Sequence, residues 1–515
     1  MDVLLVVVDD VGLADFADPA LTPRVAALRE EGRDCTLALS NPLCSQSRLA
    51  LRFGVHGRTV GIVQELDPTN PAAPIPAPGL PTLAGELAAA GYATALVGKW
   101  HCGGNPSGGS YQMAPIERGY QAWRAGIAAS RVSSYRGWER VDADASGYTQ
   151  FPETEHCAVA QIDEAESWWA AHVGQPRFLE VALNLAHGPF HVPPASLLSG
   201  YTIPPVPDKR DKFLAMVRAA DTVIGRLLDM PGAREALVVV VSDNGTSPNA
   251  VEDPALQARL KGPTFDGGIR VPLVIRGPGV TVGEYDELLH LVDVPRAILD
   301  YVGCPVPTSW DGLLYRSSAI SESISPSTGG LDQCLRTRYQ KLRRVLDRGR
   351  APVEEFYDLV LDPQELSPVI SPPPGVLAAM RDVLYDWPVA SRVRRRRTSG
   401  GSGMARFGLR SATAAAITSG GPTQDIDITG IDQPKAALYQ MTSGLTVGTI
   451  AQVARHSVGM TDGTTERDVV NMWEDGGTTM ATHDTGYRQD IATVIQQTVT
   501  ASETLDGEAD HNQWN

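Results

Sequence analysis

The sequence predicts an α/β fold, with one large and mainly parallel sheet covered by helices on both faces, followed by a small β-rich module. Unbroken aliphatic runs such as Val3–Val8 and Ala236–Val241 are typical of strands that are buried on both faces. Segments with the apolar spacing of helices lie between these runs. A change in composition near residue 392 then separates the large domain from the module.

The large domain is predicted to span residues 1–392, where strands and helices alternate. Alternation favours parallel strands, because each helix returns the chain to the edge of the sheet from which it left. We expect strands at Val3–Val8, Tyr92–Val97, Phe178–Leu185, Ala236–Val241 and Val271–Ile275, and helices at Pro23–Glu31, Pro81–Ala90, Phe213–Leu228 and Val292–Val302.

Residues 393–403 have the composition of a flexible linker, with an arginine run followed by glycine and serine. Residues 404–515 are rich in Thr, Gly, Ala and Asp and contain no cysteine. Short alternating segments at Thr423–Ile431 and Ala437–Val447 predict a small β-rich appendage. Such an appendage is expected to serve docking or assembly, for example attachment to a particle or virion.

Composition excludes several classes of protein. The formal net charge of −16 argues against a nucleic-acid binder, which needs a basic face. The six cysteines are scattered without a CxxC pair, so we expect neither a disulfide framework nor a zinc knuckle. The run Val3–Val8 lacks a basic flank and is too short to span a bilayer, and no other stretch is long enough. We therefore expect cytoplasmic synthesis, without a signal peptide or a membrane span.

Polar pairs follow two of the predicted strands. Asp9 and Asp10 come directly after the first strand, and Asp243 and Asn244 follow the strand Ala236–Val241. Carboxylate and amide oxygens are hard ligands that suit Ca²⁺ or Mg²⁺. Taken singly, the first pair could be a helix-capping turn and the second an Asn-Gly turn. Because ligands of an open α/β sheet gather at the carboxyl ends of its strands, the two pairs together predict a metal site.

Cys44 is predicted to lie at the N-terminus of a helix, with Arg48 one turn further on. The helix dipole favours an anion at this position. A single cysteine is more often a core residue, but the segment around Cys44 is polar, which core packing explains poorly.

Four basic residues follow other predicted strands or lie in polar loops, namely Lys99, His101, His187 and Lys261. Any one of them alone would be read as a surface residue. On one rim they would hold a tetrahedral anion and protonate its leaving group.

Seven motifs in order over residues 1–392 resemble the sulfatase family, within the alkaline-phosphatase-like superfamily. The family's DDxG is found at Asp9–Gly12, its C-x-P-S-R signature at Cys44–Arg48, its GKWH at Gly98–His101 and its DNG at Asp243–Gly245. The remaining matches are His187 ahead of a Pro-Phe segment, Lys261 ahead of the GG-x-RVP stretch that ends at Pro272, and YDL-x-x-DP at Tyr357–Pro363.

The resemblance implies an α/β hydrolase of sulfate esters, in which the signature cysteine is oxidised to formylglycine and then hydrated to a gem-diol nucleophile. Carried over by residue, Cys44 is the precursor of this nucleophile, and Arg48 and His101 orient it. Lys99, His187 and Lys261 bind the sulfate, and His187 or Lys261 protonates the leaving oxygen. The implied ligands of Ca²⁺ or Mg²⁺ are Asp9, Asp10, Asp243, Asn244 and the oxygen derived from Cys44.

One signature position departs from the family, which has proline or sometimes alanine where this chain has Gln46. The formylglycine-generating enzyme reads this segment before folding, so Gln46 bears directly on conversion of Cys44. Two alternatives to a hydrolase of sugar or aryl sulfates stay open, the first because a basic rim does not distinguish sulfate from phosphate and the second because of Gln46. One is a phosphodiester or phosphonate monoester hydrolase with the same nucleophile, and the other is an inactive, anion-binding scaffold.

The segments that would shape a substrate pocket, Gly103–Arg131 and Thr246–Gln257, are predicted to be loops. The first contains Tyr111, Tyr120 and Trp123, whose rings could stack on a sugar or could simply pack locally. The sequence therefore leaves the sulfated small molecule or glycan unidentified.

Overall fold

The computed structural model describes residues 1–67, 76–104, 110–127, 132–324, 329–347 and 349–386, and three strands between 437 and 467. The chain divides into two compact units, Met1–Gly401 and Ser402–Asn515. This division falls within the linker expected at 393–403, which itself lies outside the described residues.

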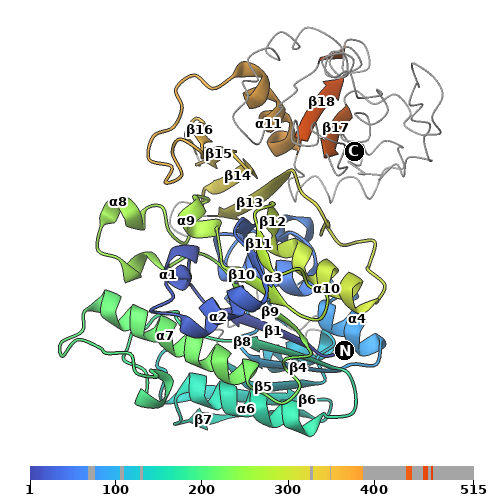
Figure 1. The fold of residues 1–515 in the computed structure, drawn as a ribbon, viewed down its shortest axis with the longest axis vertical. Coiled ribbons are helices and arrows are strands. Elements are labelled where there is room, and N and C mark those ends of the chain that lie inside the picture. Colours follow the sequence, from blue (N-terminus) through green and yellow to red (C-terminus); the bar gives the residue numbers. More distant parts are fainter. Residues whose placement is uncertain are drawn as a thin grey trace. The chain divides into compact units, whose positions relative to one another are not determined.

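The first unit is built on a ten-stranded sheet (Figure 1). Its five central strands, from β9 to β5, are parallel, which confirms the main prediction for the fold. The strands β2, β10, β6 and β7 run antiparallel to their inner neighbours, which the alternation of elements did not predict. The order is β11 (Gly283–Tyr285), β2 (Arg33–Cys35), β10 (Leu273–Arg276), β9 (Leu237–Ser242), β1 (Val3–Val8), β8 (Arg177–Ala182), β4 (Ala93–Gly98), β5 (Ala122–Ile127), β6 (Trp138–Asp144) and β7 (Gly147–Glu153).

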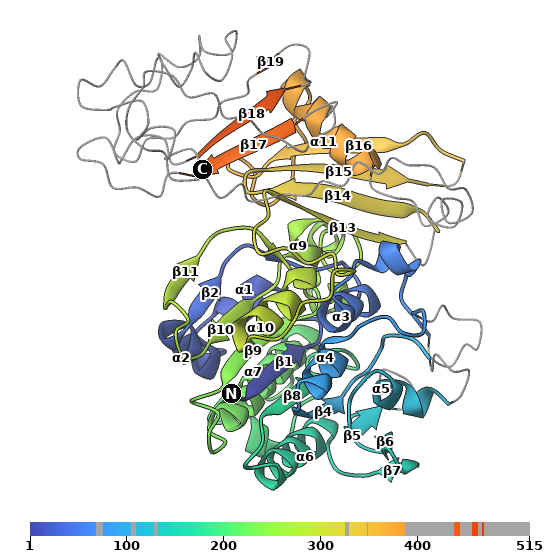
Figure 2. The same cartoon turned by 90° about the vertical axis from the view of Figure 1, so that its right-hand side faces the viewer.

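Helices cover both faces of this sheet (Figures 1 and 2). Strand β1 is buried throughout, and its alternate residues enter two separate cores. One core is covered by α2 (Pro23–Glu31), α6 (Cys157–Ala171) and α7 (Lys209–Leu228), and the other by α3 (Cys44–Phe53), α4 (Leu83–Ala89) and α10 (Val294–Val302). The shorter helices are α1 (Leu13–Ala17), α5 (Ala114–Glu117), α8 (Pro254–Gln257) and α9 (Asp266–Ile269).

The two segments predicted to be loops contain regular structure. Gly103–Arg131 includes α5 and β5, and Thr246–Gln257 ends in α8. Tyr120 and Trp123 are 2% and 0% exposed, so their rings belong to the core and are not free to stack on a sugar. Tyr111 packs edge-on against Trp123, with ring centroids 6.1 Å apart. Local packing is therefore the correct reading of these aromatic residues.

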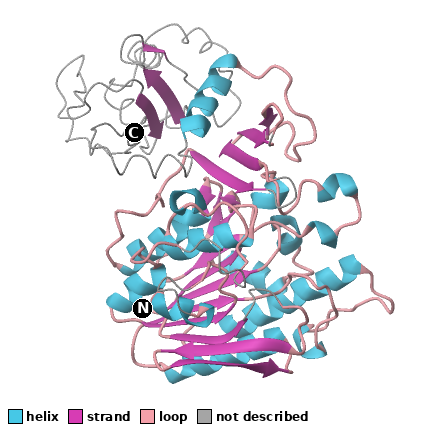
Figure 3. Ribbon diagram, turned by 180° about the vertical axis from the view of Figure 1, so that it is seen from behind, coloured by secondary structure: helices cyan, strands magenta, loops and turns pink. Residues whose placement is uncertain are grey.

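A second, antiparallel sheet of four strands follows in the same unit (Figure 3). Apolar side chains on one of its faces pack against α11 (Pro374–Asp386). The strands are β13 (Ser318–Ile324), β14 (Leu331–Thr337), β15 (Gln340–Leu346) and β16 (Val353–Asp358). A separate sheet of two parallel strands is formed by β3 (Ala38–Leu39) and β12 (Leu289–His290).

In the second unit the described residues form three antiparallel strands, β17 (Ala437–Thr442), β18 (His456–Thr461) and β19 (Glu466–Arg467). Strand β17 falls within the alternating segment predicted at Ala437–Val447, whereas Thr423–Ile431 lies outside the described residues. Across the described parts of the chain, no helix combines the length and apolarity needed to cross a membrane.

A buried ion cluster ties the second sheet to α9. Lys341 on β15 is fully buried, and its Nζ lies 2.5 Å from Asp266 Oδ1 and 2.7 Å from Glu365 Oε1. Arg336 Nη2 lies 3.0 Å from Asp266 Oδ2. Burial alone would raise the pKa of Asp266, but Lys341 and Arg336 outweigh it and hold that pKa well below its usual value.

The substitution Asp266→Asn is expected to lower the free energy of unfolding by about 3–5 kcal/mol, because it leaves the buried Arg336 without its carboxylate and removes one of the two carboxylates that pair with Lys341. Urea unfolding at pH 7 measures this loss. The contribution of Asp266 is fully present above the unfolded pKa of about 3.9 and disappears as pH falls further. Asp266→Glu keeps the charge and is the control; equal stability of Asp266→Asn and wild type would contradict the prediction.

Candidate active site

Two carboxylates leave the end of β1 together. Asp9 and Asp10 follow Val8 directly, and both are buried. Asp10 adopts a left-handed conformation (φ 60°), and its backbone N–H donates to Asp243 Oδ1 at 3.2 Å. Because β1 pairs in parallel with β9, Asp243 and Asn244 emerge at the same edge of the sheet. The two polar pairs that the sequence singled out therefore lie side by side.

Cys44 is the first residue of α3, as predicted, and its side chain faces this acidic group. Its Sγ lies 3.6 Å from Asp9 Oδ1 and 3.8 Å from Asp10 Oδ1. Donor atoms of Asp9, Asp10, Cys44 and Asp243 all lie within 4.8 Å of one another. Burial raises the pKa of the Cys44 thiol well above its usual value, and the charge of Asp243 raises it further. As an unmodified thiol, Cys44 is therefore a poor nucleophile.

Three basic side chains balance the three carboxylates. Arg48 Nη2 lies 2.8 Å from Asp243 Oδ2, and Lys99 Nζ lies 2.7 Å from Asp9 Oδ2. Lys261 Nζ lies 2.6 Å from Asp10 Oδ1 and 3.1 Å from Cys44 Sγ. Burial would raise the pKa of Asp9, but Lys99 and Arg48 hold it below its usual value. Lys261 and His187 do the same for Asp10 against its own burial.

Lys99 and His101 reach the site through a turn at the end of β4. Gly98 has φ +93°, and a Cβ at this position would lie 2.2 Å from the carbonyl oxygen of Ala182, so only glycine fits. His101 Nε2 lies 2.9 Å from the carbonyl oxygen of Leu66. Burial, reinforced by Lys99, lowers the pKa of His101 well below its usual value. The hydrogen bond to Leu66 fixes the imidazole beside Cys44.

His187 lies at the more open side of the site. Its Nε2 is 3.8 Å from Asp10 Oδ2, and its side chain is 21% exposed. The segment that carries it runs from β8 and is held by Tyr135, whose hydroxyl donates to the carbonyl oxygens of Asn184 and, at 2.8 Å, of His187. The structure thus brings His187 to the same site as the other basic residues, at its rim.

The donor set fits a hard divalent cation. Asn244 Nδ2 donates to Asp10 Oδ1 at 2.8 Å, while Asn244 Oδ1 is buried and has no hydrogen-bond partner among the described residues. An unpaired amide oxygen beside three carboxylates is the oxygen-rich environment that Ca²⁺ or Mg²⁺ takes. Asp9, Asp10, Asp243 and Asn244 are therefore the residues that would hold such an ion.

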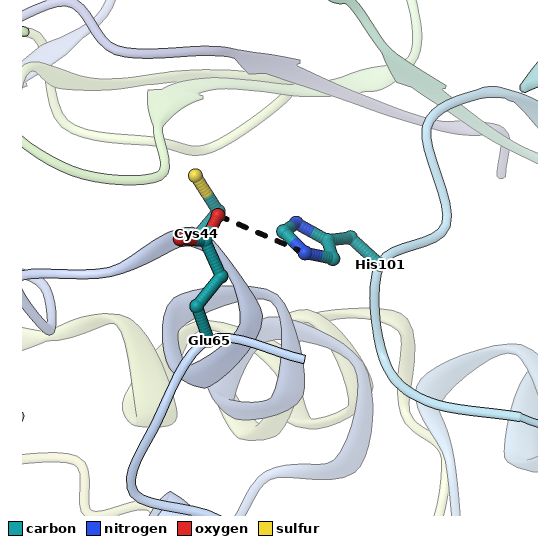
Figure 4. A group of neighbouring side chains, drawn as sticks. All are labelled: Cys44, Glu65 and His101. Carbon is teal, nitrogen blue, oxygen red and sulfur yellow. Dashed lines mark ion pairs between the residues drawn. The ribbon is translucent and has the colours of Figure 1, made fainter. Parts of the chain in front are cut away.

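Two features of the site could not be predicted from the sequence, namely the position of Glu65 and the burial of Gln46. Glu65 lies in a polar stretch between motifs, yet its carboxylate reaches Cys44 and His101 (Figure 4). Gln46 is 1% exposed, and neither atom of its amide has a hydrogen-bond partner among the described residues. Both depend on how α3 packs against segments distant in the sequence, which local patterns do not encode.

The fold and the site together define the structural class of this protein. A largely parallel sheet with helices on both faces, carboxylates at the ends of β1 and β9 and a cysteine at the start of α3 is an alkaline-phosphatase-like architecture. The model of the sulfatase family matches residues 1–304, more than half of the chain. The chain therefore belongs to the sulfatase family.

Individual relatives agree with this assignment. N-acetylgalactosamine-6-sulfatase of Sus scrofa is 28% identical and covers 61% of this chain, which spans 64% of that protein's length. Arylsulfatase A of Bos taurus is 27% identical, with coverage of 59% of this chain and 65% of that protein. The structure of Ps i-CgsB in complex with k-i-k-neocarrahexaose superposes with a TM-score of 0.63 at 21% identity, over 75% of this chain and 92% of that one, which supports the fold.

The pair formed by His156 and His191 makes the free energy of unfolding depend on pH. His156 Nε2 lies 2.8 Å from His191 Nε2, and burial, reinforced by His191, lowers the pKa of His156 to about 3. Below the unfolded value of about 6.5 the unfolded chain binds a proton that the folded chain refuses, so stability falls as pH falls from 6.5 toward 3.

We expect the free energy of unfolding to drop by about 1 kcal/mol per pH unit through His156 alone between pH 6 and 4. His156→Phe should flatten the profile by this amount in denaturant unfolding at several pH values. His172→Phe, at the other end of α6, is the control. Parallel profiles for wild type and His156→Phe would show that the ring of His156 does not carry the effect.

Proposed function

We propose that this protein hydrolyses a sulfate ester of a sugar or of a small aromatic alcohol. The observation that carries the proposal is the position of Cys44, at a helix N-terminus among three carboxylates and three basic side chains. The named activities of the relatives support both substrate types, since one acts on a sugar sulfate and the other is an arylsulfatase.

The proposed nucleophile is formylglycine, made from Cys44 by a formylglycine-generating enzyme and then hydrated. One hydroxyl of the gem-diol loses its proton and attacks sulfur, and the bond from sulfur to the alcohol oxygen breaks. The second hydroxyl then loses its proton, the bond from carbon to the sulfate oxygen breaks, sulfate leaves and the aldehyde returns. This route explains why a buried thiol of raised pKa stands where a nucleophile is needed.

The surrounding residues have separate proposed roles. Arg48 and His101 orient the nucleophile, and Lys99 and Lys261 bind sulfate oxygens. His187, at the rim, or Lys261 protonates the departing alcohol oxygen. A divalent cation, Ca²⁺ or Mg²⁺, held by Asp9, Asp10, Asp243 and Asn244 would supply charge neutralisation for the sulfate group.

The test is turnover, compared across three esters. Full-length protein made beside a formylglycine-generating enzyme is assayed with a sulfate monoester, a phosphodiester and a phosphonate monoester. Faster release from the sulfate ester supports the proposal, and preference for either phosphorus ester would reassign the activity. The mass of the peptide around Cys44 is measured on the same sample, because an intact thiol with no turnover would indicate an inactive anion-binding protein.

Gln46 leads to a prediction about maturation. In α3 the first intrahelical bond runs from Ser47 N–H to the carbonyl oxygen of Leu43, so proline at position 46 removes no helical hydrogen bond. Gln46→Pro also removes a buried amide that has no partner among the described residues. With limiting maturation enzyme, we expect a larger converted fraction of Cys44 in Gln46→Pro than in wild type, read from peptide masses.

Gln46→Asn keeps an amide at the same signature position and is the matched control. It is expected to convert no better than wild type. Equal conversion of all three proteins would mean that position 46 does not limit maturation, and the prediction would then be abandoned.

For residues 404–515 we propose a role in docking or assembly, based on their change in composition after the linker. Sedimentation of the full chain beside a chain ending at residue 392 tests it. A larger assembly of the full chain alone supports the role, and identical monomeric behaviour of both contradicts it.

A further inference from the structure

Glu65 places a seventh charged group at the mouth of the site. Donor atoms of Cys44, Glu65 and His101 all lie within 4.8 Å of one another (Figure 4). The Glu65 side chain is 40% exposed, whereas those of Cys44 and His101 are buried. The carboxylate of Glu65 is therefore accessible to the alcohol portion of an ester whose sulfur lies at Cys44.

The position of this carboxylate is fixed by its neighbour. The Leu66 backbone N–H donates to Ser45 Oγ at 2.9 Å, and the Leu66 carbonyl oxygen accepts from His101 Nε2 at 2.9 Å. The Leu66 side chain is 2% exposed and belongs to the core beneath the sheet. Two residues that flank the nucleophile thus hold the segment from both sides, so Glu65 cannot move far from the site without breaking these bonds.

The charge of Glu65 acts on the rest of the site more weakly than the other carboxylates do, since it helps to raise the pKa of Lys261 less than Asp10 and Asp9 do. Arg48, Lys99 and Lys261 are each within 2.8 Å of another carboxylate. Within the described residues the ion pair of Glu65 is a contact of 3.9 Å between its Oε1 and His101 Nε2. A carboxylate beside an anion site works against sulfate binding by simple repulsion. It is useful there when it contacts a hydrogen-bond donor on the remainder of the substrate.

We propose that Glu65 is a specificity-determining residue, which accepts a hydrogen bond from a hydroxyl group beside the scissile sulfate ester and excludes substrates that carry a second sulfate at that place. This inference rests on the proposed function and deepens it. It predicts a protein that prefers monosulfated sugars. A hydroxyl beside the scissile ester donates a hydrogen bond to Glu65, whereas a second sulfate at that place is repelled by its charge.

The experiment uses the full chain, made beside a formylglycine-generating enzyme, with three substrates. Galactose 6-sulfate has a free 4-hydroxyl beside the carbon that carries the sulfated CH2 group. Galactose 4,6-disulfate has a second sulfate in place of that hydroxyl, and 4-nitrophenyl sulfate has neither group. The variants are Glu65→Gln, which keeps shape but removes charge, and Glu65→Ala. Glu31→Gln, on α2 and paired with Arg276, is the matched control.

Wild type is expected to favour the monosulfate over the disulfate in kcat/KM, and Glu65→Gln is expected to reduce that ratio by about tenfold. Glu65→Ala should also slow the monosulfate, because it removes the acceptor. Glu31→Gln should match wild type with all three substrates. A monosulfate-to-disulfate ratio that is unchanged in both Glu65 variants would overturn the inference.

Calorimetric binding of the two galactose sulfates separates this inference from the function on which it rests. If no sulfate ester is turned over, the proposed function fails, but the ratio of the two dissociation constants still reports on Glu65. A ratio that shifts with Glu65→Gln supports the inference, and a ratio that does not shift refutes it.

Discussion

Replacing Cys44 by alanine is expected to abolish sulfate ester hydrolysis, with a loss of at least about 10⁴-fold in kcat/KM. The reason is that the substitution removes the thiol that the formylglycine-generating enzyme oxidises, so no aldehyde forms, while Lys261 and Asp10 remain beside the vacated position. Release of 4-nitrophenol from its sulfate ester measures the loss, with the protein made beside a formylglycine-generating enzyme.

Cys157 supplies a matched control for this substitution. Like Cys44, it is a fully buried cysteine at the first position of a helix, here α6. Burial raises the pKa of the Cys157 thiol, whereas charged neighbours also act on the thiol of Cys44. Cys157→Ala is therefore expected to keep its activity. Loss of activity in both variants would point to damage to the fold, and an active Cys44→Ala would remove Cys44 from the chemistry.

Removal of divalent cations is expected to lower kcat/KM by at least about 10³-fold, and Ca²⁺ or Mg²⁺ should restore it. The physical reason is that Asp9, Asp10 and Asp243 present three buried carboxylates to an anionic substrate. The same ion should stabilise the folded chain, by about 2.7 kcal/mol at a concentration one hundred times its dissociation constant. Thermal unfolding with and without a chelator measures this second effect.

Asp243→Asn is the variant that tests where the ion acts. It removes one charged ligand of the proposed site, so added Ca²⁺ or Mg²⁺ should restore little activity and give a smaller shift in Tm. Asp163→Asn, an exposed carboxylate on α6, is the control. Activity that survives exhaustive chelation, or an equal shift in Tm for Asp243→Asn and wild type, would contradict a metal at these residues.

The sequence alone determined the central sheet and most of the site. Val3–Val8 is apolar at every position, which only a strand buried on both faces explains, and Asp9 follows it without a break. Parallel strands place their carboxyl ends at one edge, so Asp9 and Asp243 had to meet although 234 positions separate Asp9 from Asp243 in the numbering of the chain. Cys44 at a helix N-terminus followed from the polar residues before it and the apolar ones after it.

Other features were decided by the tertiary structure. The antiparallel strands β10 and β6 at the flanks of the parallel centre depend on pairings between distant segments, which apolar periodicity does not report. Trp123, which the sequence left as a candidate for stacking on a sugar, is fully buried and belongs to the core. Glu65 lies beside Cys44 because the Leu66 backbone hydrogen-bonds to the side chains of Ser45 and His101. These contacts join segments that are distant in the sequence, so no local pattern predicts them.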